Sequence, residues 1–218
     1  MRAGEPLILW DWTFNHLPDI ARRVQEHLVL TGIAVGVGFV LAFALSLAIR
    51  QVPQLYAPVT WLAGVLYSIP SLALFAVLIP FTGLSIATAE IGLVSYTLLI
   101  LVRNIVGGIR SVPPEVRESA IGMGYSQWQL LWRIELPLGL AVIIAGVRVA
   151  LVTTIGLVTV TGIIGQGGLG SLILLGIQQF FATPLVIGAV LSIALAVVLD
   201  GALVVLQRRV TPWTRPAA

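Results

Sequence analysis

The apolar stretch "LVLTGIAVGVGFVLAFALSLAI" runs from Leu28 to Ile49 and is followed directly by Arg50. It contains no charged side chain, and Gly and Ala alternate with Val, Leu, Ile and Phe along its length. An α-helix needs about 20 apolar residues to cross the hydrocarbon core of a bilayer. The stretch is therefore predicted to be a membrane-spanning helix, which indicates an all-α polytopic membrane protein.

The composition of the chain supports this class. Of its 218 residues, 58% are hydrophobic and only 10% are charged, and the mean hydropathy is +1.05. A soluble domain carries about 25% charged residues. No long polar segment remains from which a separate soluble domain could be built. The absence of cysteine excludes disulfides, iron–sulfur clusters and thiol chemistry.

Further apolar runs follow the first along the chain. They are residues 55–81, 88–109, 137–161 and 184–206. The run 55–81 contains Pro58, Pro70 and Pro80, so it is either one long kinked span or two broken halves. Counting it once gives five spans, which we favour, and splitting it at Pro70 gives six.

The arginines indicate the orientation of the spans, because cytoplasmic loops carry an excess of Lys and Arg. With five spans, one side holds Arg50, Arg110, Arg117, Arg133, Arg208, Arg209 and Arg215, and the other holds Arg2, Arg22 and Arg23. The first group is predicted to be cytoplasmic, which places the N-terminus outside and the C-terminus inside. Six spans would place both termini inside. The predicted parts are an extracytoplasmic or interfacial segment 1–27, a transmembrane domain 28–206 and a cytoplasmic tail 207–218.

A cytoplasmic segment, residues 111–136, interrupts the apolar runs. Gly122 and Gly124 lie in its middle and permit a sharp turn, and Ser126 with Gln129 is predicted to form a capping box. Two short helices joined at this glycine turn are expected. Leu136 precedes Pro137 and is therefore expected to leave the helix, so that Pro137 begins the next span.

The second of these short helices carries an apolar stripe with a charged end. Trp128, Leu131, Trp132 and Glu135 fall at positions i, i+3, i+4 and i+7, which is one face of a helix. Such a stripe lies on the membrane surface or enters the groove of a partner protein. From the physical pattern alone, both interpretations stay open.

The stretch "ESAIGMGYSQWQLLWRIELP", residues 118–137, resembles the EAA loop of ABC importer permeases, whose pattern is E-A-A-x3-G-x9-I-x-L-P. The positions that correspond are Glu118, Ser119, Ala120, Gly124, Ile134, Leu136 and Pro137. Ser119 for the first alanine is the one departure. The resemblance implies that these residues couple the chain to separate ATPase subunits. The sequence contains no G-x-x-x-x-G-K-[ST] phosphate loop, so ATP and Mg²⁺ are expected on the partner, and the chain itself is expected to be a transport subunit without a cofactor.

The resemblance extends over most of the chain. The stretches "YSIPSLALFAVLIPFTG" (67–83), "ELPLGLAVIIAGVRVA" (135–150) and "IIGQGGLGSLI" (163–173) are similar to permeases of osmoprotectant importers for glycine betaine, choline or carnitine. This implies the type I, methionine-permease-like fold in a bacterial cytoplasmic (inner) membrane. The implied partners are ATPase subunits, an extracytoplasmic binding protein, a second permease copy or homologue, and membrane lipid, with no nucleic acid. The alternatives are an importer of the same fold for methionine or another small solute and, less favoured, a stand-alone carrier or channel.

Other residues have two interpretations each. The outer loop with Gly165, Gly167, Gly168 and Gly170 matches G-x-G-x-x-G only formally, because no strand and no nearby acid accompany it. It is expected to be a tight or re-entrant turn, or part of a gate. Tyr67, Ser68 and Pro70 are candidates for the pathway or an interface, with packing as the alternative for Tyr67. His16 and His27 are expected to lie alone on the outer side, where neither makes a metal site.

Three charged residues are predicted inside spans, where charge is costly and is usually paired or faces water. Arg103 and Asp200 are expected at similar depth near the inner side, so we expect them to pair. Arg148 lies in the middle of its span and is a candidate for the pathway or an interface, with structural pairing as the alternative.

Overall fold

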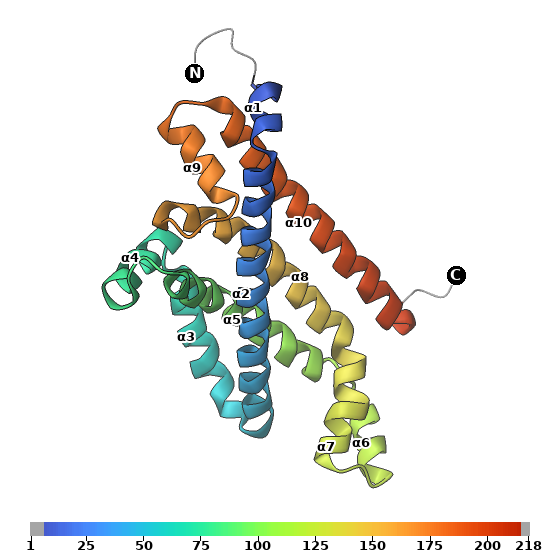
Figure 1. Cartoon of the computed structure of the whole chain (residues 1–218). Helices are drawn as coiled ribbons and strands as arrows, with labels where there is room; N and C mark the ends of the chain where they lie inside the picture. The colour runs from blue at the N-terminus through green and yellow to red at the C-terminus, as the bar shows by residue number, and fades with distance from the viewer. Residues whose placement is uncertain (1–6, 215–218) are drawn as a thin grey trace.

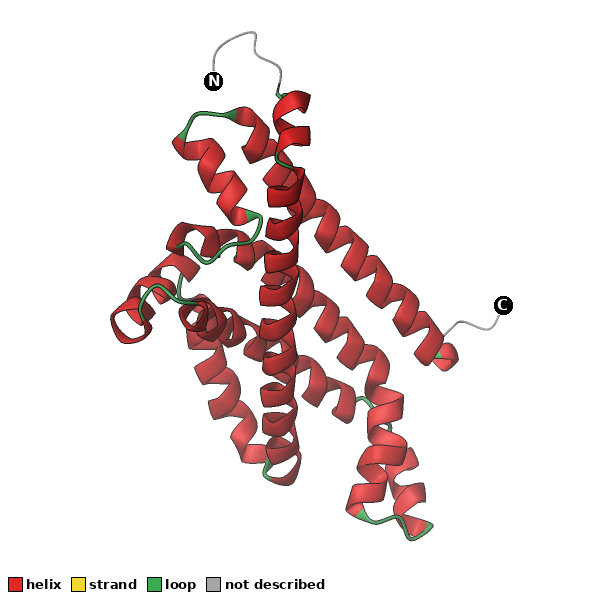
Figure 2. Cartoon of the chain, in the orientation of Figure 1, coloured by secondary structure: helices red, strands yellow, loops and turns green. Residues whose placement is uncertain are grey.

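The computed structural model describes residues 7–214, and the predicted orientation markers Arg2 and Arg215 lie outside them. Figure 2 shows that the described chain consists of helices joined by short loops, with no strand. The helices follow one another in Figure 1 in this order: α1 (Trp10–Asn15), α2 (Leu17–Gln51), α3 (Tyr56–Ser68), α4 (Ser71–Thr82), α5 (Ile86–Arg110), α6 (Pro114–Gly122), α7 (Gln127–Leu130), α8 (Leu136–Thr161), α9 (Gly170–Gln178) and α10 (Ala182–Val210).

Four continuous helices are long and apolar enough to cross a membrane, and the pair α3 and α4 makes a fifth span when taken together. The four are Leu17–Gln51, Ile86–Arg110, Gln127–Ile164 and Ala182–Val210. The first begins at Leu17, well before the apolar run that predicted it. At 35 residues it is about 50 Å long, which exceeds the hydrocarbon thickness of about 30 Å. The predicted boundary between a segment 1–27 and the spans therefore falls inside one helix.

The run 55–81 is broken at Pro70, where α3 and α4 bend by 97°. The halves have 13 and 12 residues, or about 20 Å each, so neither can cross the bilayer alone. This favours five spans over six. Ile69 before the proline has an extended backbone, as steric contact with the proline ring requires. The hydroxyl of Tyr96 on α5 donates a hydrogen bond to the carbonyl of Ile69, which fixes the bend against α5.

Helix α5 lies at the centre of the bundle and packs against α2, α3, α4 and α8. Its crossing with α8 is close because both helices have glycine there. A Cβ on Gly139 would lie 2.4 Å from the carbonyl oxygen of Gly108, and a Cβ on Gly146 would lie 2.2 Å from Cβ of Asn104. Small residues of this kind allow helix backbones to approach in membranes.

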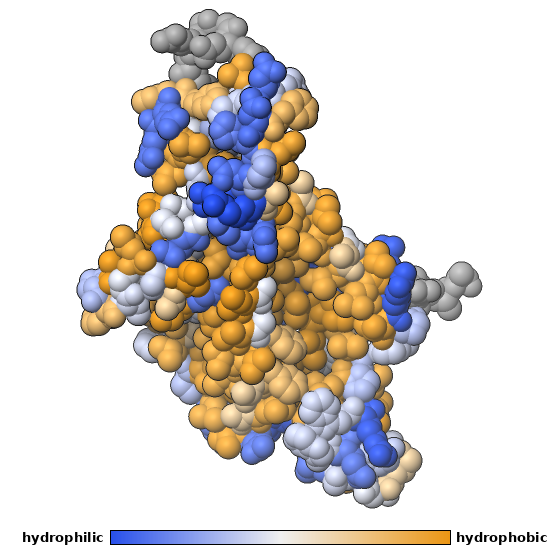
Figure 3. All heavy atoms as spheres, viewed as in Figure 1, coloured by the Kyte–Doolittle hydropathy of each residue, from blue (hydrophilic) through white to orange (hydrophobic). Residues whose placement is uncertain are grey.

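The outer surface of the bundle matches a lipid environment. In the most apolar 18-residue stretch of α10, only 6% of the residues are buried within the chain. Ile193, Val197 and Val198 on this helix are each at least 65% exposed. Figure 3 shows apolar surface over the middle of this face, whereas hydrophilic residues gather over α6 and α7 and along the N-terminal part of α2. The polar ends of the molecule thus lie far apart.

Candidate functional site

The first candidate site is the coupling segment, residues 114–135, which projects from one end of the bundle (Figure 1). Helix α6 begins at Pro114. Proline suits this position because a backbone N–H in the first turn would have no acceptor within the helix. The chain then turns at Gly124, whose φ of +83° is unfavourable for residues with a side chain. The predicted capping box is present: Ser126 Oγ accepts from the N–H of Gln129, and Gln129 Oε1 accepts from the N–H of Ser126.

The motif residues divide into an exposed part and a packed base. Glu118, Ser119 and Gly124 are exposed, Ala120 is buried, and Ile134, Leu136 and Pro137 are half-buried. Apolar side chains are also exposed on the coupling segment, namely Ile121 (51%), Met123 (69%) and Trp128 (60%). An exposed polar and apolar mixture at one tip of a chain is typical of a surface that meets another protein.

The expected break at Leu136 is wrong. Leu136 has helical backbone angles, and α7 continues through a π-turn, Leu131–Glu135, into α8 without interruption. Proline inside an α-helix clashes with the carbonyl four residues earlier and lacks the N–H that would bond it. The π-turn changes this bonding pattern, since the N–H of Leu136 donates to the carbonyl of Leu131 five residues back. The sequence QWQLLWRIELP, residues 127–137, thus forms the start of the same helix that crosses the membrane.

A buried ion-pair network fixes the base of the coupling segment. Glu135 is 2% exposed, and its carboxylate receives Arg50 Nε from α2 at 2.6 Å and Arg117 Nη1 from α6 at 3.6 Å. Arg50 also donates through Nη2 to the backbone carbonyl of Gln127 at 3.1 Å. The contact from Arg50 to Glu135 is a charge-assisted hydrogen bond, which is the strong kind, whereas Arg117 contributes an ion pair. Helix α2, helix α6 and the π-turn before α8 are therefore tied together at the carboxylate of Glu135.

The predicted apolar stripe does not act as one surface. Leu131 and Glu135 are buried in the bundle, while Trp128 and Trp132 are 60% and 47% exposed. The two tryptophan rings contact each other with centroids 5.5 Å apart, and Trp132 also contacts Phe43 of α2 at 6.1 Å. The stripe therefore anchors the segment on one side and presents tryptophan on the other.

The second candidate site is the glycine loop, residues 165–169, between α8 and α9. Gly165, Gly167 and Gly168 have φ values of +75°, +77° and +69°, which explains why glycine occurs at all three positions. Gly170 begins α9 against the end of α8, where a Cβ would lie 1.9 Å from the carbonyl oxygen of Thr159. The sequence interpretation as a tight turn fits this geometry.

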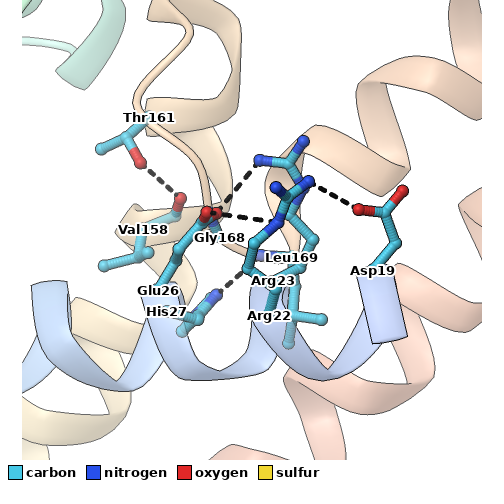
Figure 4. Close-up of polar contacts among 9 residues, drawn as sticks. All are labelled: Asp19, Arg22, Arg23, Glu26, His27, Val158, Thr161, Gly168 and Leu169. Atoms are coloured by element: carbon cyan, nitrogen blue, oxygen red, sulfur yellow. Dashed lines mark hydrogen bonds and ion pairs between the residues drawn. The ribbon is translucent and has the colours of Figure 1, made fainter. Parts of the chain in front are cut away.

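The glycine loop is fastened to α2 by two residues that sequence reasoning did not select (Figure 4). Glu26 Oε2 accepts from the N–H of Gly168 at 3.0 Å and from Arg23 Nη1 at 3.0 Å. His27, expected to lie alone, is fully buried: its Nδ1 accepts from the N–H of Leu169 at 3.3 Å and its Nε2 lies 3.1 Å from the carbonyl oxygen of Ile155.

These two contacts define the protonation state of His27. A backbone N–H can only donate and a carbonyl oxygen can only accept, so Nδ1 carries no proton and Nε2 carries one. His27 is therefore a neutral imidazole that joins α2 to α8 and to the first turn of α9. The contact set of Glu26 and His27 with residues 155, 168 and 169 is called the outer contact below.

The intramembrane charges pair differently from the expectation. Asp200 pairs with Arg148 rather than Arg103, through Nε–Oδ1 at 2.8 Å and Nη2–Oδ2 at 2.9 Å. Helix α10 packs along α8, so Asp200 meets the arginine of that helix. Arg103 is exposed on α5, and no ion pair to it occurs within residues 7–214.

The remaining candidates lie at the α3–α4 bend. Tyr67 contacts Tyr96 edge-on with ring centroids 5.8 Å apart, Ser68 Oγ donates to the carbonyl of Val65 at 2.8 Å, and Pro70 precedes the first turn of α4. Tyr67 is therefore in direct contact with α5, whereas the hydrogen bond of Ser68 stays within α3.

The fold agrees with comparisons to known proteins. Residues 31–212 match the sequence model of the family described as "Binding-protein-dependent transport system inner membrane component". The chain belongs to this family, and it is thus a multi-pass, non-catalytic permease subunit of an ABC importer in the inner membrane. Such a system also contains ATPase subunits and a binding protein.

Relatives with stated substrates are similar over nearly the whole chain. The osmoprotectant import permease protein OsmW of Salmonella typhimurium is 38% identical over 88% of this chain and 92% of its own length. The glycine betaine/carnitine/choline transport system permease protein OpuCB of Bacillus subtilis is 32% identical, covering 89% of each. The carnitine transport permease protein OpuCB of Listeria monocytogenes is 36% identical, covering 87% of each.

Solved structures confirm the predicted fold. The MetNI methionine ABC transporter in inward-facing conformations matches with a TM-score of 0.77 at 23% identity, over 88% of this chain and 96% of the matched chain. A second crystal form of the same transporter matches with a TM-score of 0.79 at 22% identity, over 90% and 98%. At this identity the likeness concerns the fold.

Proposed function

We propose that this chain is the permease subunit of an importer for small quaternary ammonium osmoprotectants such as glycine betaine, choline or carnitine. The observation that supports this substrate class is the identity of 32–38% to permeases named for these solutes, over 86–89% of the chain. The segments 67–83, 135–150 and 163–173 resemble the same group.

We further propose that the coupling segment docks on the ATPase subunit. Its exposed part includes Glu118, Met123 and Trp128, which offer a carboxylate and apolar side chains to a partner groove. Its base is held by Glu135, Arg50 and Arg117. A displacement of the docked helix is therefore passed to α2, α6 and α8 rather than absorbed by a loose loop.

The proposed orientation places the coupling segment and the C-terminus in the cytoplasm and the N-terminus outside. The inner ends of α2 and α5 and the start of α6 bring Arg50, Arg110 and Arg117 to one end of the bundle, as the positive-inside rule expects. The exposed Arg103 within α5 supports a second permease copy or homologue facing this helix, because an arginine within the bilayer needs a partner or an aqueous path.

The test is ATP-driven uptake into proteoliposomes that hold the permease with its own ATPase and binding protein. Labelled glycine betaine, choline and methionine are offered separately. Glu118→Lys and Gly124→Asp are expected to abolish uptake while the subunits still insert. Asp11→Lys is the matched control, since it makes the same charge change at an exposed residue of α1, at the other end of the molecule.

The outcomes separate the parts of the proposal. ATP-dependent uptake of a quaternary amine that the two loop variants abolish supports both the substrate class and the coupling role. Uptake of methionine alone would refute the substrate class and leave the coupling role standing. Uptake that Glu118→Lys and Gly124→Asp leave at the level of Asp11→Lys would refute the coupling role.

A further inference from the structure

A small cavity with a strongly basic wall lies beside the base of the coupling segment. Its volume is about 150 Å³, and it is bounded by the inner ends of α2 and α5 and by α6. The three arginines on its wall come from three different elements: Arg50 from α2, Arg110 from α5 and Arg117 from α6. Neither the coupling motif nor the comparisons with known proteins assign a role to it. This arginine cavity is distinct from the exposed tip proposed to meet the ATPase.

The charges around the arginine cavity do not balance. Glu135 pairs with Arg50 and Arg117, and no other carboxylate in residues 7–214 lies within ion-pair distance of the three arginines. Arg110 instead has its guanidinium 4.7 Å above the ring centroid of Tyr56, a contact that holds its position without neutralising it. Three guanidinium groups against one carboxylate leave an excess of two positive charges at this site.

The hydrogen-bond donors are likewise incompletely used. Arg117 donates through Nη2 to the carbonyl of Ile109 at the end of α5, but its Nε is closed off from solvent and has no acceptor. A buried donor without a partner is unfavourable by about 1–3 kcal/mol, and such groups are rare in folded proteins. Arg110, on another element of the cavity wall, makes its contact with the Tyr56 ring face, which leaves its guanidinium N–H groups available to an acceptor in the cavity.

We propose that the arginine cavity binds one phosphate-type oxyanion, supplied either by the phosphodiester of an anionic lipid or by free inorganic phosphate. Guanidinium groups bind such oxygens in paired, charge-assisted hydrogen bonds. A bound oxyanion offsets the excess charge and accepts from guanidinium N–H groups on the cavity wall, those of Arg110 among them. The same wall repels quaternary ammonium cations, so the site is separate from the transported solute.

Binding here also has a structural consequence. Arg50 and Arg117 hold Glu135, so an oxyanion on their other side would fix the same two side chains that fix the coupling segment. The site therefore lies where occupancy can stiffen the connection between α2, α6 and the helix that begins at α7.

The experiment measures the thermal unfolding of the full-length permease in a neutral detergent. One arm adds phosphatidylglycerol against phosphatidylcholine, and the other adds sodium phosphate against sodium chloride at equal ionic strength. Wild type and the control Arg209→Gln, an exposed arginine of α10, are expected to shift upward in Tm with phosphatidylglycerol or phosphate. Arg110→Gln is expected to weaken the apparent Kd at least about tenfold, the effect of losing one charge-assisted contact.

Arg110 is chosen over Arg50 and Arg117 because it takes no part in the ion pairs of Glu135, so Arg110→Gln is expected to fold. A shift with phosphatidylglycerol alone identifies lipid as the source, and a shift with sodium phosphate identifies a soluble oxyanion. No shift in either arm, or an equal Kd in Arg110→Gln and Arg209→Gln, overturns the proposal. The readout does not involve transport, so the proposed function is unaffected by either result.

Discussion

Removing the carboxylate of Glu135 is expected to weaken both the fold and the coupling of the permease. Glu135 is 2% exposed, and its partners Arg50 and Arg117 are 18% and 31% exposed. Breaking a buried ion pair at one partner typically destabilises by about 3–5 kcal/mol. Because water still reaches both arginines, we expect about 2–3 kcal/mol for Glu135→Ala. Glu135→Gln keeps the shape and one acceptor, so about 1–2 kcal/mol is expected.

The assay is the free energy of unfolding of the detergent-solubilised permease, followed by circular dichroism during titration with sodium dodecyl sulfate. Glu115→Gln is the matched control, since this acid is exposed on α6 and surface changes usually stay within about 0.5 kcal/mol. In reconstituted importer, Glu135→Ala should lower solute uptake more than ATP hydrolysis, because the docked helix is then poorly connected to α2.

A double-mutant cycle between Arg50 and Glu135 tests the reasoning directly. Met at both positions replaces the ion pair by apolar contact, which buried sites often tolerate well. The double variant Arg50→Met with Glu135→Met should therefore be more stable than the sum of the single changes predicts, by at least about 1 kcal/mol. Additivity within about 0.5 kcal/mol would refute the view that this pair holds the coupling segment.

Further changes address the other sites. Gly124→Ala should destabilise by about 1 kcal/mol because φ is +83° there, as measured in the same unfolding titration, and should slow uptake. His27→Leu should destabilise by about 2 kcal/mol, since it leaves a buried N–H and a buried carbonyl without their imidazole partner. Arg148→Gln and Asp200→Asn should each reduce the yield of folded protein severalfold, because an unpaired charge in a span costs about 2.5–3.5 kcal/mol.

Each of these predictions has a control. Gly122→Ala adds a methyl group where φ is ordinary and the space is open, so it should leave stability unchanged or raise it. His16→Leu removes a partly exposed imidazole and should destabilise less than His27→Leu. A larger loss of unfolding free energy for His16→Leu would contradict the view that the contacts of His27 stabilise the fold. The charge swap Arg148→Asp with Asp200→Arg should restore part of the yield, and a yield below that of either single variant would speak against direct pairing.

The spans could be predicted from the sequence because each is a long apolar run, long enough to cross the bilayer as a helix or as a bent pair of helices. The expectation for Leu136 was wrong because the local preference of a residue before proline is weaker than the continuity of a long packed helix with a π-turn. The Arg103–Asp200 pairing was wrong because spacing from the nearest arginine gives depth in the membrane, but not the direction in which a side chain points. Depth alone could not distinguish α5 from α8 as the neighbour of α10.

The network residues were missed for a different reason. Glu135 occupies a variable position of the coupling motif, and its partners lie on other elements. The partners of His27 are backbone groups of residues 155 and 169, more than 120 positions along the chain. A short motif or a helical period cannot report contacts of this separation. A histidine at the polar start of a long apolar run was the one sequence signal available, and the sequence showed no partner for it.

The unbroken helix Gln127–Ile164 has a mechanical consequence. Its 38 residues make a rod about 57 Å long, with the coupling segment at one end and the glycine loop just past the other. A rotation of about 5° around the end that carries the coupling segment displaces the opposite end by about 5 Å on this length. If the N-terminal half of α2 does not follow, the hydrogen bond from His27 to Ile155, made at 3.1 Å, is broken by a shift of several ångströms. A small rotation at the coupling segment would therefore make or break contacts at the glycine loop, on the far side of the membrane.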